Sequence, residues 1–181
     1  MYDQLTELDD MMSSNDPYLA AQAARSPLTS VRMALDMASS EVRQEVLKAL
    51  AERPGLTTKA LRALLSAEPP AEVAAMAIRG YRGHKALREA ARSQNRFIRR
   101  EVAAHPHTEE YVLRELSYDN FVDTRVAIAT RKEIPLSVQR ILARDPAAEV
   151  RRALARHEEL FSSAREVLGE DPDPRVRQLL G

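Results

Sequence analysis

The sequence predicts an all-α fold, an α-solenoid built from about six helix-pair repeats of 26 residues. Three observations predict it: a small residue recurs every 26 positions, apolar columns accompany it in the same register, and prolines mark the joints between helices. Aromatic residues make up only 4% of the chain, and tryptophan is absent. A core of Ala, Leu, Val and Ile suits closely packed helices better than a sheet.

Four columns define the repeat. The small-residue column is Ala51, Ala77, Ala103, Ala129 and Ala155. The apolar residues that precede it are Leu50, Met76, Val102, Ile128 and Leu154. Two further columns are Ala60, Ala86, Val112, Val138, Ala164 and Leu64, Ala90, Leu116, Leu142, Leu168. These last two columns are four residues apart, on one face of a second helix. Each repeat therefore has a first helix ending near the alanine, where a small side chain lets helices approach closely.

The repeats organise residues 1–181 as a single solenoid domain. Residues 1–45 form an N-terminal degenerate or capping repeat, residues 46–175 form five regular repeats, and residues 176–181 are a truncated terminal helix. A solenoid end needs a polar outer face. The apolar Val176, Leu179 and Leu180 therefore either fold back onto the last full repeat or are covered by a partner.

Composition excludes several functional classes. The 27 basic and 27 acidic residues cancel, which gives no global case for nucleic-acid or membrane binding. Cysteine is absent, which excludes disulfides, zinc–thiolate sites and iron–sulfur clusters. The acidic N-terminus does not resemble a signal peptide, and no apolar run approaches the length of a membrane span, about 20 residues. We expect a cytoplasmic protein that does not enter a membrane.

Catalytic and metal-binding patterns are also lacking in the sequence. His105 and His107 flank a proline, but no third ligand has a recognisable spacing. Neither a nucleophile elbow nor a phosphate-binding glycine loop occurs. The sequence therefore predicts a protein that is not an enzyme and has no cofactor.

Two segments, IRREVAAHPHTEEYVLRELSYDNFVDTR (98–125) and VRRALARHEELFSSAREVLGEDPDPRVR (150–177), resemble the leucine-rich repeat variant family. The resemblance covers most of residues 46–177. It implies an all-helical, right-handed, HEAT-like solenoid, and it implies no activity. It also implies an Asp–Arg ladder in the C-terminal half, from Asp119, Asp145 and Asp171, each followed six residues later by Arg125, Arg151 and Arg177. Some members bind an iron–sulfur cluster through cysteines that this chain lacks.

Two cationic columns follow the same register. Arg53, Arg79, His105, Arg131 and His157 end the first helices, where a cation complements the negative helix C-terminus, so we interpret them as structural. The second column lies on the exposed side of the second helices and comprises Arg62, Arg88, Arg114 and Arg140, then Glu166. Lys59, Lys85, Arg92, Arg144, Tyr111 and Tyr118 flank it. This column is either a basic, partly aromatic groove for an acidic ligand or a solvated face paired with residues such as Glu89 and Glu115.

Charge is uneven along the chain. Residues 1–45 contain 3 basic and 8 acidic residues, whereas residues 46–97 contain 10 basic and 4 acidic residues. Helical spacing predicts a stripe of Lys85, Arg88, Arg92 and Arg96. The preceding joint, residues 80–84, contains Tyr81 between two glycines that permit positive φ. This joint either contacts an anion or a partner, or it is a loop variant without a binding role.

Two functions fit these features. The first is a non-catalytic repeat scaffold that binds a protein partner with an acidic surface, through a basic concave face. The candidate contacts are Arg62, Lys85, Arg88, Arg92, Arg114, Arg140, Tyr81, Tyr111 and Tyr118. The alternative is DNA binding through the same arginines, as in HEAT-like DNA-binding and glycosylase proteins. A lesser hypothesis is self-association through the C-terminal helix.

Overall fold

The computed structural model describes residues 2–37, 42–81 and 83–180, and this part of the chain contains fourteen helices and no strand. The predicted all-α class is therefore confirmed. The chain divides into two compact units, residues 1–86 and 87–181. Unit 1 contains α1 (Tyr2–Ser13), α2 (Pro17–Arg25), α3 (Val31–Met37), α4 (Arg43–Ala51), α5 (Thr58–Ser66) and α6 (Ala71–Arg79). The boundary falls within α7 (His84–Ala90). Unit 2 continues with α8 (Arg96–Ala104), α9 (Glu110–Leu116), α10 (Val122–Ala129), α11 (Leu136–Leu142), α12 (Ala148–Ala155), α13 (Ser162–Gly169) and α14 (Pro174–Gln178).

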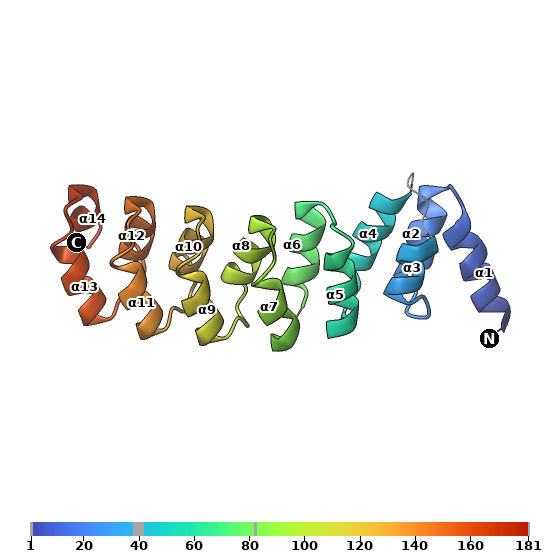
Figure 1. The fold of residues 1–181 in the computed structure, drawn as a ribbon, viewed down its shortest axis with the longest axis horizontal. Coiled ribbons are helices and arrows are strands. Elements are labelled where there is room, and N and C mark those ends of the chain that lie inside the picture. The colour runs from blue at the N-terminus through green and yellow to red at the C-terminus, as the bar shows by residue number, and fades with distance from the viewer. Residues whose placement is uncertain (1, 38–41, 82, 181) are drawn as a thin grey trace. The chain divides into compact units, whose positions relative to one another are not determined.

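Within each unit, alternate helices pack against one another. In unit 1, α4 lies between α2 and α6, and α3 contacts α5. In unit 2, α8, α10, α12 and α14 form one row, while α9, α11 and α13 form a second row (Figure 1). The first row corresponds to the first helices of the repeat and the second row to the second helices. Handedness, the number of repeats and the single domain stay predictions.

Several helices begin at short polar residues or prolines. The Asp16 carboxylate accepts a hydrogen bond from the backbone N–H of Tyr18 at 2.8 Å, and Pro17 occupies the first helical turn of α2. The Thr57 hydroxyl accepts from the N–H of Ala60 at 3.1 Å at the start of α5. These contacts satisfy N–H groups that have no partner within the helix.

The small-residue column lies in the core of both units. Each of its five alanines is no more than 5% exposed, and four of the five preceding apolar residues are fully buried. Met76 is the exception and is half-buried. The first helices end at or within two residues of this column. Because neighbouring first helices pack there, we expect little space for a side chain larger than alanine.

An Asp–Arg ladder connects successive first-helix starts in unit 2. Each guanidinium donates from Nε to the carboxylate 20 residues later, and the Nε···Oδ2 distance is 2.6 Å in Arg99–Asp119, Arg125–Asp145 and Arg151–Asp171. Each also donates from Nη1 to the backbone carbonyl six residues earlier, as Arg125 does to Asp119 at 2.6 Å. The expected ladder is present, and it begins one step earlier than the Asp–x₅–Arg spacing predicted, at Arg99.

The helix-end cations form a second set of connections in unit 2. The Arg131 guanidinium donates from Nη1 to the carbonyls of Ala103 (2.8 Å) and His105 (2.6 Å), and from Nη2 to that of Pro106 (3.2 Å). The ring of His157 contacts the Lys132 carbonyl at 3.2 Å through Nε2. These side chains therefore connect to the C-terminal end of the preceding first helix or to the joint after it.

The C-terminal helix packs onto the helices before it. Val176 is fully buried, Leu179 and Leu180 are half-buried, and α14 contacts both α12 and α13. The Arg165 guanidinium donates to the carbonyl of Leu180 at 3.0 Å. The apolar residues of the C-terminal helix therefore fold back onto the last full repeat, which was the first of the two alternatives. Gly181 lies outside the described residues.

Candidate binding surfaces

The second helices of unit 2 present the predicted arginine column to solvent. Arg88, Arg114 and Arg140 are exposed at the same repeat position of α7, α9 and α11. Helix α11 contacts both α9 and α13, and the exposed Glu166 continues the column on α13. The column therefore follows helices that pack side by side, at least from α9 to α13.

Part of this positive charge is neutralised by neighbouring glutamates. Arg88 lies 3.5 Å from Glu109 and over the ring of Tyr111, 5.3 Å from its centroid. Arg92 lies 3.6 Å from Glu115. These are contacts between successive repeats rather than within one helix, and such exposed ion pairs contribute little to stability.

Arg114 and Arg140 differ from Arg88 in their contacts. Within the part of the chain that the structure describes, the Arg140 side chain makes only a long hydrogen bond, 3.4 Å from Nε to the Ser163 hydroxyl. No ion pair or side-chain hydrogen bond of Arg114 occurs among the described residues. Tyr118, at the end of α9, is 72% exposed, and Tyr111 is 43% exposed. These side chains remain available to a partner.

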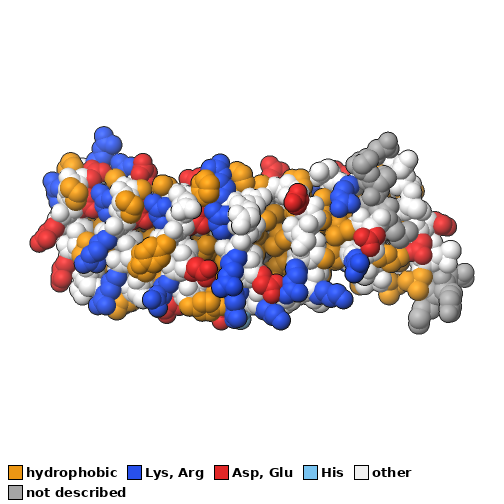
Figure 2. All heavy atoms as spheres, viewed as in Figure 1, with side chains coloured by type: hydrophobic (Ala, Val, Ile, Leu, Met, Phe, Trp, Pro, Cys, Tyr) orange, Lys and Arg blue, Asp and Glu red, His pale blue; other side chains and the backbone are white. Residues whose placement is uncertain are grey.

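Charges of both signs share the surface of unit 2. In Figure 2, Lys and Arg side chains are interspersed with Asp and Glu side chains and with hydrophobic side chains over α9–α14. The face of unit 2 seen in this view therefore has no continuous positive surface.

The predicted stripe over residues 85–96 does not lie on one helix. Helix α7 ends at Ala90, and α8 begins at Arg96 after Asn95, whose side chain accepts from the N–H of Phe97 at 2.9 Å. Lys85 is exposed on α7 and Arg92 follows that helix. The stripe prediction is wrong because the helix that the charge spacing assumed ends at Ala90, and a separate helix begins after Asn95.

Arg96 instead belongs to an aromatic cluster that the sequence analysis missed. Its guanidinium lies over the rings of Phe97 and Phe121, 4.8 Å and 5.2 Å from their centroids. The two phenylalanines are 44% and 39% exposed and lie at the starts of α8 and α10. Their sequence separation of 24 is not a full repeat, so no column reveals them.

Tyr81 is not a surface residue. Its side chain is 4% exposed, and its hydroxyl lies 2.6 Å from the hydroxyl of Thr58. A Cβ added to Gly83 would overlap the Tyr81 ring, and Gly80 has a φ of −77°. The expected positive φ is therefore absent from these two glycines, and Gly83 instead makes room for the ring. Arg82, in the same joint, lies outside the described residues.

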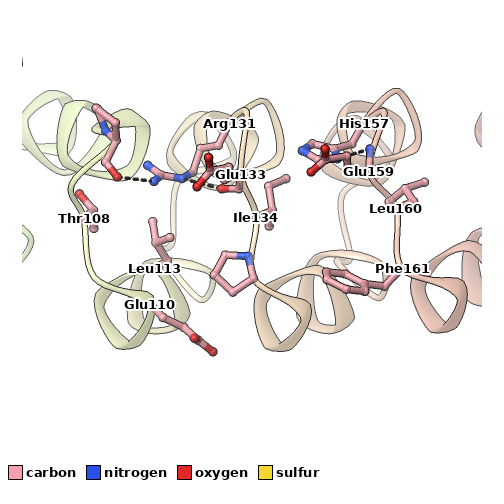
Figure 3. Close-up of a pocket in the computed structure, with 12 residues that line it drawn as sticks. Thr108, Glu110, Leu113, Arg131, Glu133, Ile134, His157, Glu159, Leu160 and Phe161 are labelled. Atoms are coloured by element: carbon pink, nitrogen blue, oxygen red, sulfur yellow. Dashed lines mark hydrogen bonds between the residues drawn. The ribbon is translucent and has the colours of Figure 1, made fainter.

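A pocket of about 500 Å³ lies in unit 2 between the first-to-second-helix joints (Figure 3). Figure 3 shows Arg131 and His157 on the first-helix side and Leu113 and Phe161 on the second-helix side. Glu110, Glu133 and Glu159 also line it. The pocket therefore contains carboxylates as well as cations. No group of three or more His, Asp or Glu residues that could hold a metal ion occurs in the described ranges.

A larger groove, about 900 Å³, lies in unit 1. The joints after α2 and α4 and the helices α3 and α5 line it. Among the described residues that line it, the charged ones are all basic and comprise Arg25, Arg32, Arg53, Lys59 and Arg62. Sequence reasoning found Arg62 and Lys59 but not the groove. The signal was the run of basic residues without a carboxylate from Arg53 to Arg62, combined with small residues on α5.

None of the helices in the described part of the chain is long and apolar enough to cross a membrane. Comparison with protein-family models, with curated proteins and with solved structures found no match to this chain. The resemblance to leucine-rich repeat variant proteins therefore stays a prediction.

Proposed function

We propose that the protein is a non-catalytic repeat scaffold that binds a protein partner through an acidic surface of that partner. The observation that carries the proposal is the exposure of Arg114 and Arg140 at one repeat position of two contacting helices, α9 and α11. Arg88, with Tyr111 beside it, extends the same column. The proposal includes the finer fold predictions: a right-handed solenoid of about six repeats with the second helices on its concave face.

The glutamates of this surface favour a protein partner over a nucleic acid. Glu109 and Glu115 pair with Arg88 and Arg92 across successive repeats, and they would repel a phosphate backbone placed along the column. A protein partner can match both signs of charge. DNA binding is therefore the alternative that the experiment tests.

The experiment compares wild type with the triple variant Arg88→Glu, Arg114→Glu, Arg140→Glu. A matched control, Arg100→Glu, Arg156→Glu, Arg175→Glu, reverses the same number of exposed charges away from the second helices. Each form is incubated with cell extract, and bound proteins are cross-linked to it. We expect a partner to be recovered with wild type and the control but not with the triple variant. The cross-links should lie in Asp- and Glu-rich peptides of that partner.

Equal recovery by the triple variant and wild type would contradict the proposal. A second measurement titrates a fluorescent duplex DNA at low salt. Steeply salt-dependent binding that fails only in the triple variant would favour the nucleic-acid alternative instead.

A further inference from the structure

The groove of unit 1 has an apolar floor that an incoming side chain can reach. Pro27, Val31 and Leu56 line it together with Ala60 and Ala63 of α5. At the corresponding repeat positions, α11 of unit 2 carries the larger Val138 and Ile141. Both alanines are half-buried. Small residues on α5 therefore leave space between α3 and α5, and the volume of about 900 Å³ lies within the range of ligand-binding clefts.

The charged residues described along the rim of this groove all carry a positive charge. Of its five cations, Arg25 pairs with Glu52 at 2.9 Å and Arg32 lies 3.6 Å from Asp36, but neither carboxylate lines the groove. Lys59 is exposed and forms no ion pair among the described residues. The groove therefore has a positive potential that attracts anions.

Arg53 is a groove cation whose hydrogen-bonding capacity is only partly used within the described part of the chain. Arg131 occupies the same repeat position in unit 2, where it donates to four backbone carbonyls, the fourth being that of Glu133 at 3.3 Å from Nε. Arg53 donates from Nη2 to the carbonyl of Thr29 at 2.7 Å, and its buried Nε has no hydrogen-bond partner among the described residues. The buried hydroxyl of Thr29 likewise has no hydrogen-bond partner in residues 2–37, 42–81 and 83–180. An unsatisfied buried donor is costly, more so when it carries charge.

Burial lowers the pKa of Arg53 from its usual value, although the guanidinium remains charged at neutral pH. A negative charge in the groove would compensate for this lost hydration. In unit 2, by contrast, the pocket beside Arg131 already contains three glutamates. The two sites thus differ in charge although they occupy the same position of the repeat.

We propose that the groove of unit 1 binds a short acidic peptide segment of a protein partner. One apolar side chain of the segment lies between α3 and α5, and its carboxylates lie beside Arg53, Lys59 and Arg62. Several cations spread over joints and helices suit a segment with several carboxylates better than a ligand with one. This inference rests on the proposed function for the class of partner, but it assigns a different surface.

The test is a selection from a random dodecapeptide library displayed on phage, with the full chain as the target. We expect the selected peptides to contain several Asp or Glu residues and at least one Leu, Ile or Phe. Measured by fluorescence polarisation, their affinity should fall about tenfold or more in the Lys59→Glu, Arg62→Glu variant, since two nearby charges are reversed. It should also fall in Ala63→Leu, which fills the floor without changing the charge.

The Arg114→Glu, Arg140→Glu variant is the matched control, because Arg140 occupies the repeat position of Arg62. Circular dichroism checks that each variant folds. Peptides that lose affinity only in this control would overturn the groove assignment while supporting the proposed function. Peptides without an acidic and apolar consensus, or equal binding to the groove variants, would also overturn it. Saturable binding of dodecanoate with a failed peptide selection would assign the groove to a fatty acid instead.

Discussion

Replacing Arg125 with Met should destabilise unit 2 strongly, because Arg125 is the most deeply buried cation of the Asp–Arg ladder. Its side chain is 9% exposed, and that of its partner Asp145 is 2% exposed. The guanidinium contacts the carboxylate at 2.6 Å and 2.9 Å and the carbonyl of Asp119 at 2.6 Å. The substitution leaves the buried carboxylate with a single backbone hydrogen bond, from the N–H of Ala147 at 2.8 Å.

Removing one partner of a buried ion pair costs about 3–5 kcal/mol, because the other charge stays buried without compensation. We therefore expect Arg125→Met to lower the free energy of unfolding by about that amount. Urea unfolding, followed by circular dichroism at about 222 nm, measures the change. A second substitution, Asp145→Leu in the same chain, removes the orphaned charge, so the double variant should lose less stability than Arg125→Met alone.

Arg92→Met is the control for this experiment. Arg92 also pairs with a carboxylate of the next repeat, Glu115, but the two side chains are 68% and 49% exposed. Solvent screens such a pair, so the control should cost less than about 1 kcal/mol. If Arg125→Met and Arg92→Met had equal effects, the reasoning that burial gives the ladder its strength would be refuted.

Three further predictions concern another residue of the ladder, the joint at Gly83 and the small-residue column. Burial by itself would raise the pKa of Asp171, but hydrogen bonds from Arg151 and from the backbone outweigh it and lower that pKa. Its stabilisation is therefore complete above the unfolded-state pKa of about 3.9 and is lost as the pH falls through the lower folded-state pKa. The urea concentration at the unfolding midpoint should therefore be lower at about pH 3 than at about pH 6, and equal midpoints would count against the ladder. Gly83→Ala should lower the melting temperature of unit 1, since the new methyl group displaces the Tyr81 ring; thermal unfolding that matches wild type would contradict this. Ala103→Leu should cost about 1–3 kcal/mol in urea unfolding through overpacking at a fully buried site, and a neutral result would show that the column is not close-packed.

The repeat architecture could be predicted because its signals are local in sequence and periodic. The alanines of the small-residue column, for example Ala103 and Ala129, are buried at the positions that the 26-residue register assigned. The prolines that mark the joints between helices likewise act within one helical turn. Constraints of this kind do not depend on how distant parts of the chain pack.

The ladder was predicted only in part, because its geometry links residues 20 positions apart. The carbonyl six residues before each arginine belongs to the backbone, so any residue can supply it. Ser93 does so for Arg99 at 2.8 Å. The search for an aspartate at that position therefore missed the first pair, although Asp119 was in place to accept from Arg99.

The binding surfaces were the least predictable feature. Tyr81 looked exposed in a glycine-containing joint, but Gly83 lets its ring turn inward. The groove of unit 1 depends on which side chains are absent: large residues at Ala60 and Ala63, and carboxylates among the described residues that line it. A single sequence shows the residues that are present more readily than the space that small residues leave.

The spacing of the ladder has a consequence for how this chain can change length during evolution. Each arginine of the ladder donates hydrogen bonds to a carbonyl six residues before it and to a carboxylate 20 residues after it. Excising residues 120–145 would therefore bring Arg151 six residues after Asp119 and leave Arg99 with its partner. Loss or duplication of a whole 26-residue block preserves every such contact, whereas the insertion or deletion of a single residue breaks the register. The ladder thus makes this part of the chain modular, so that repeats can be gained or lost as intact units.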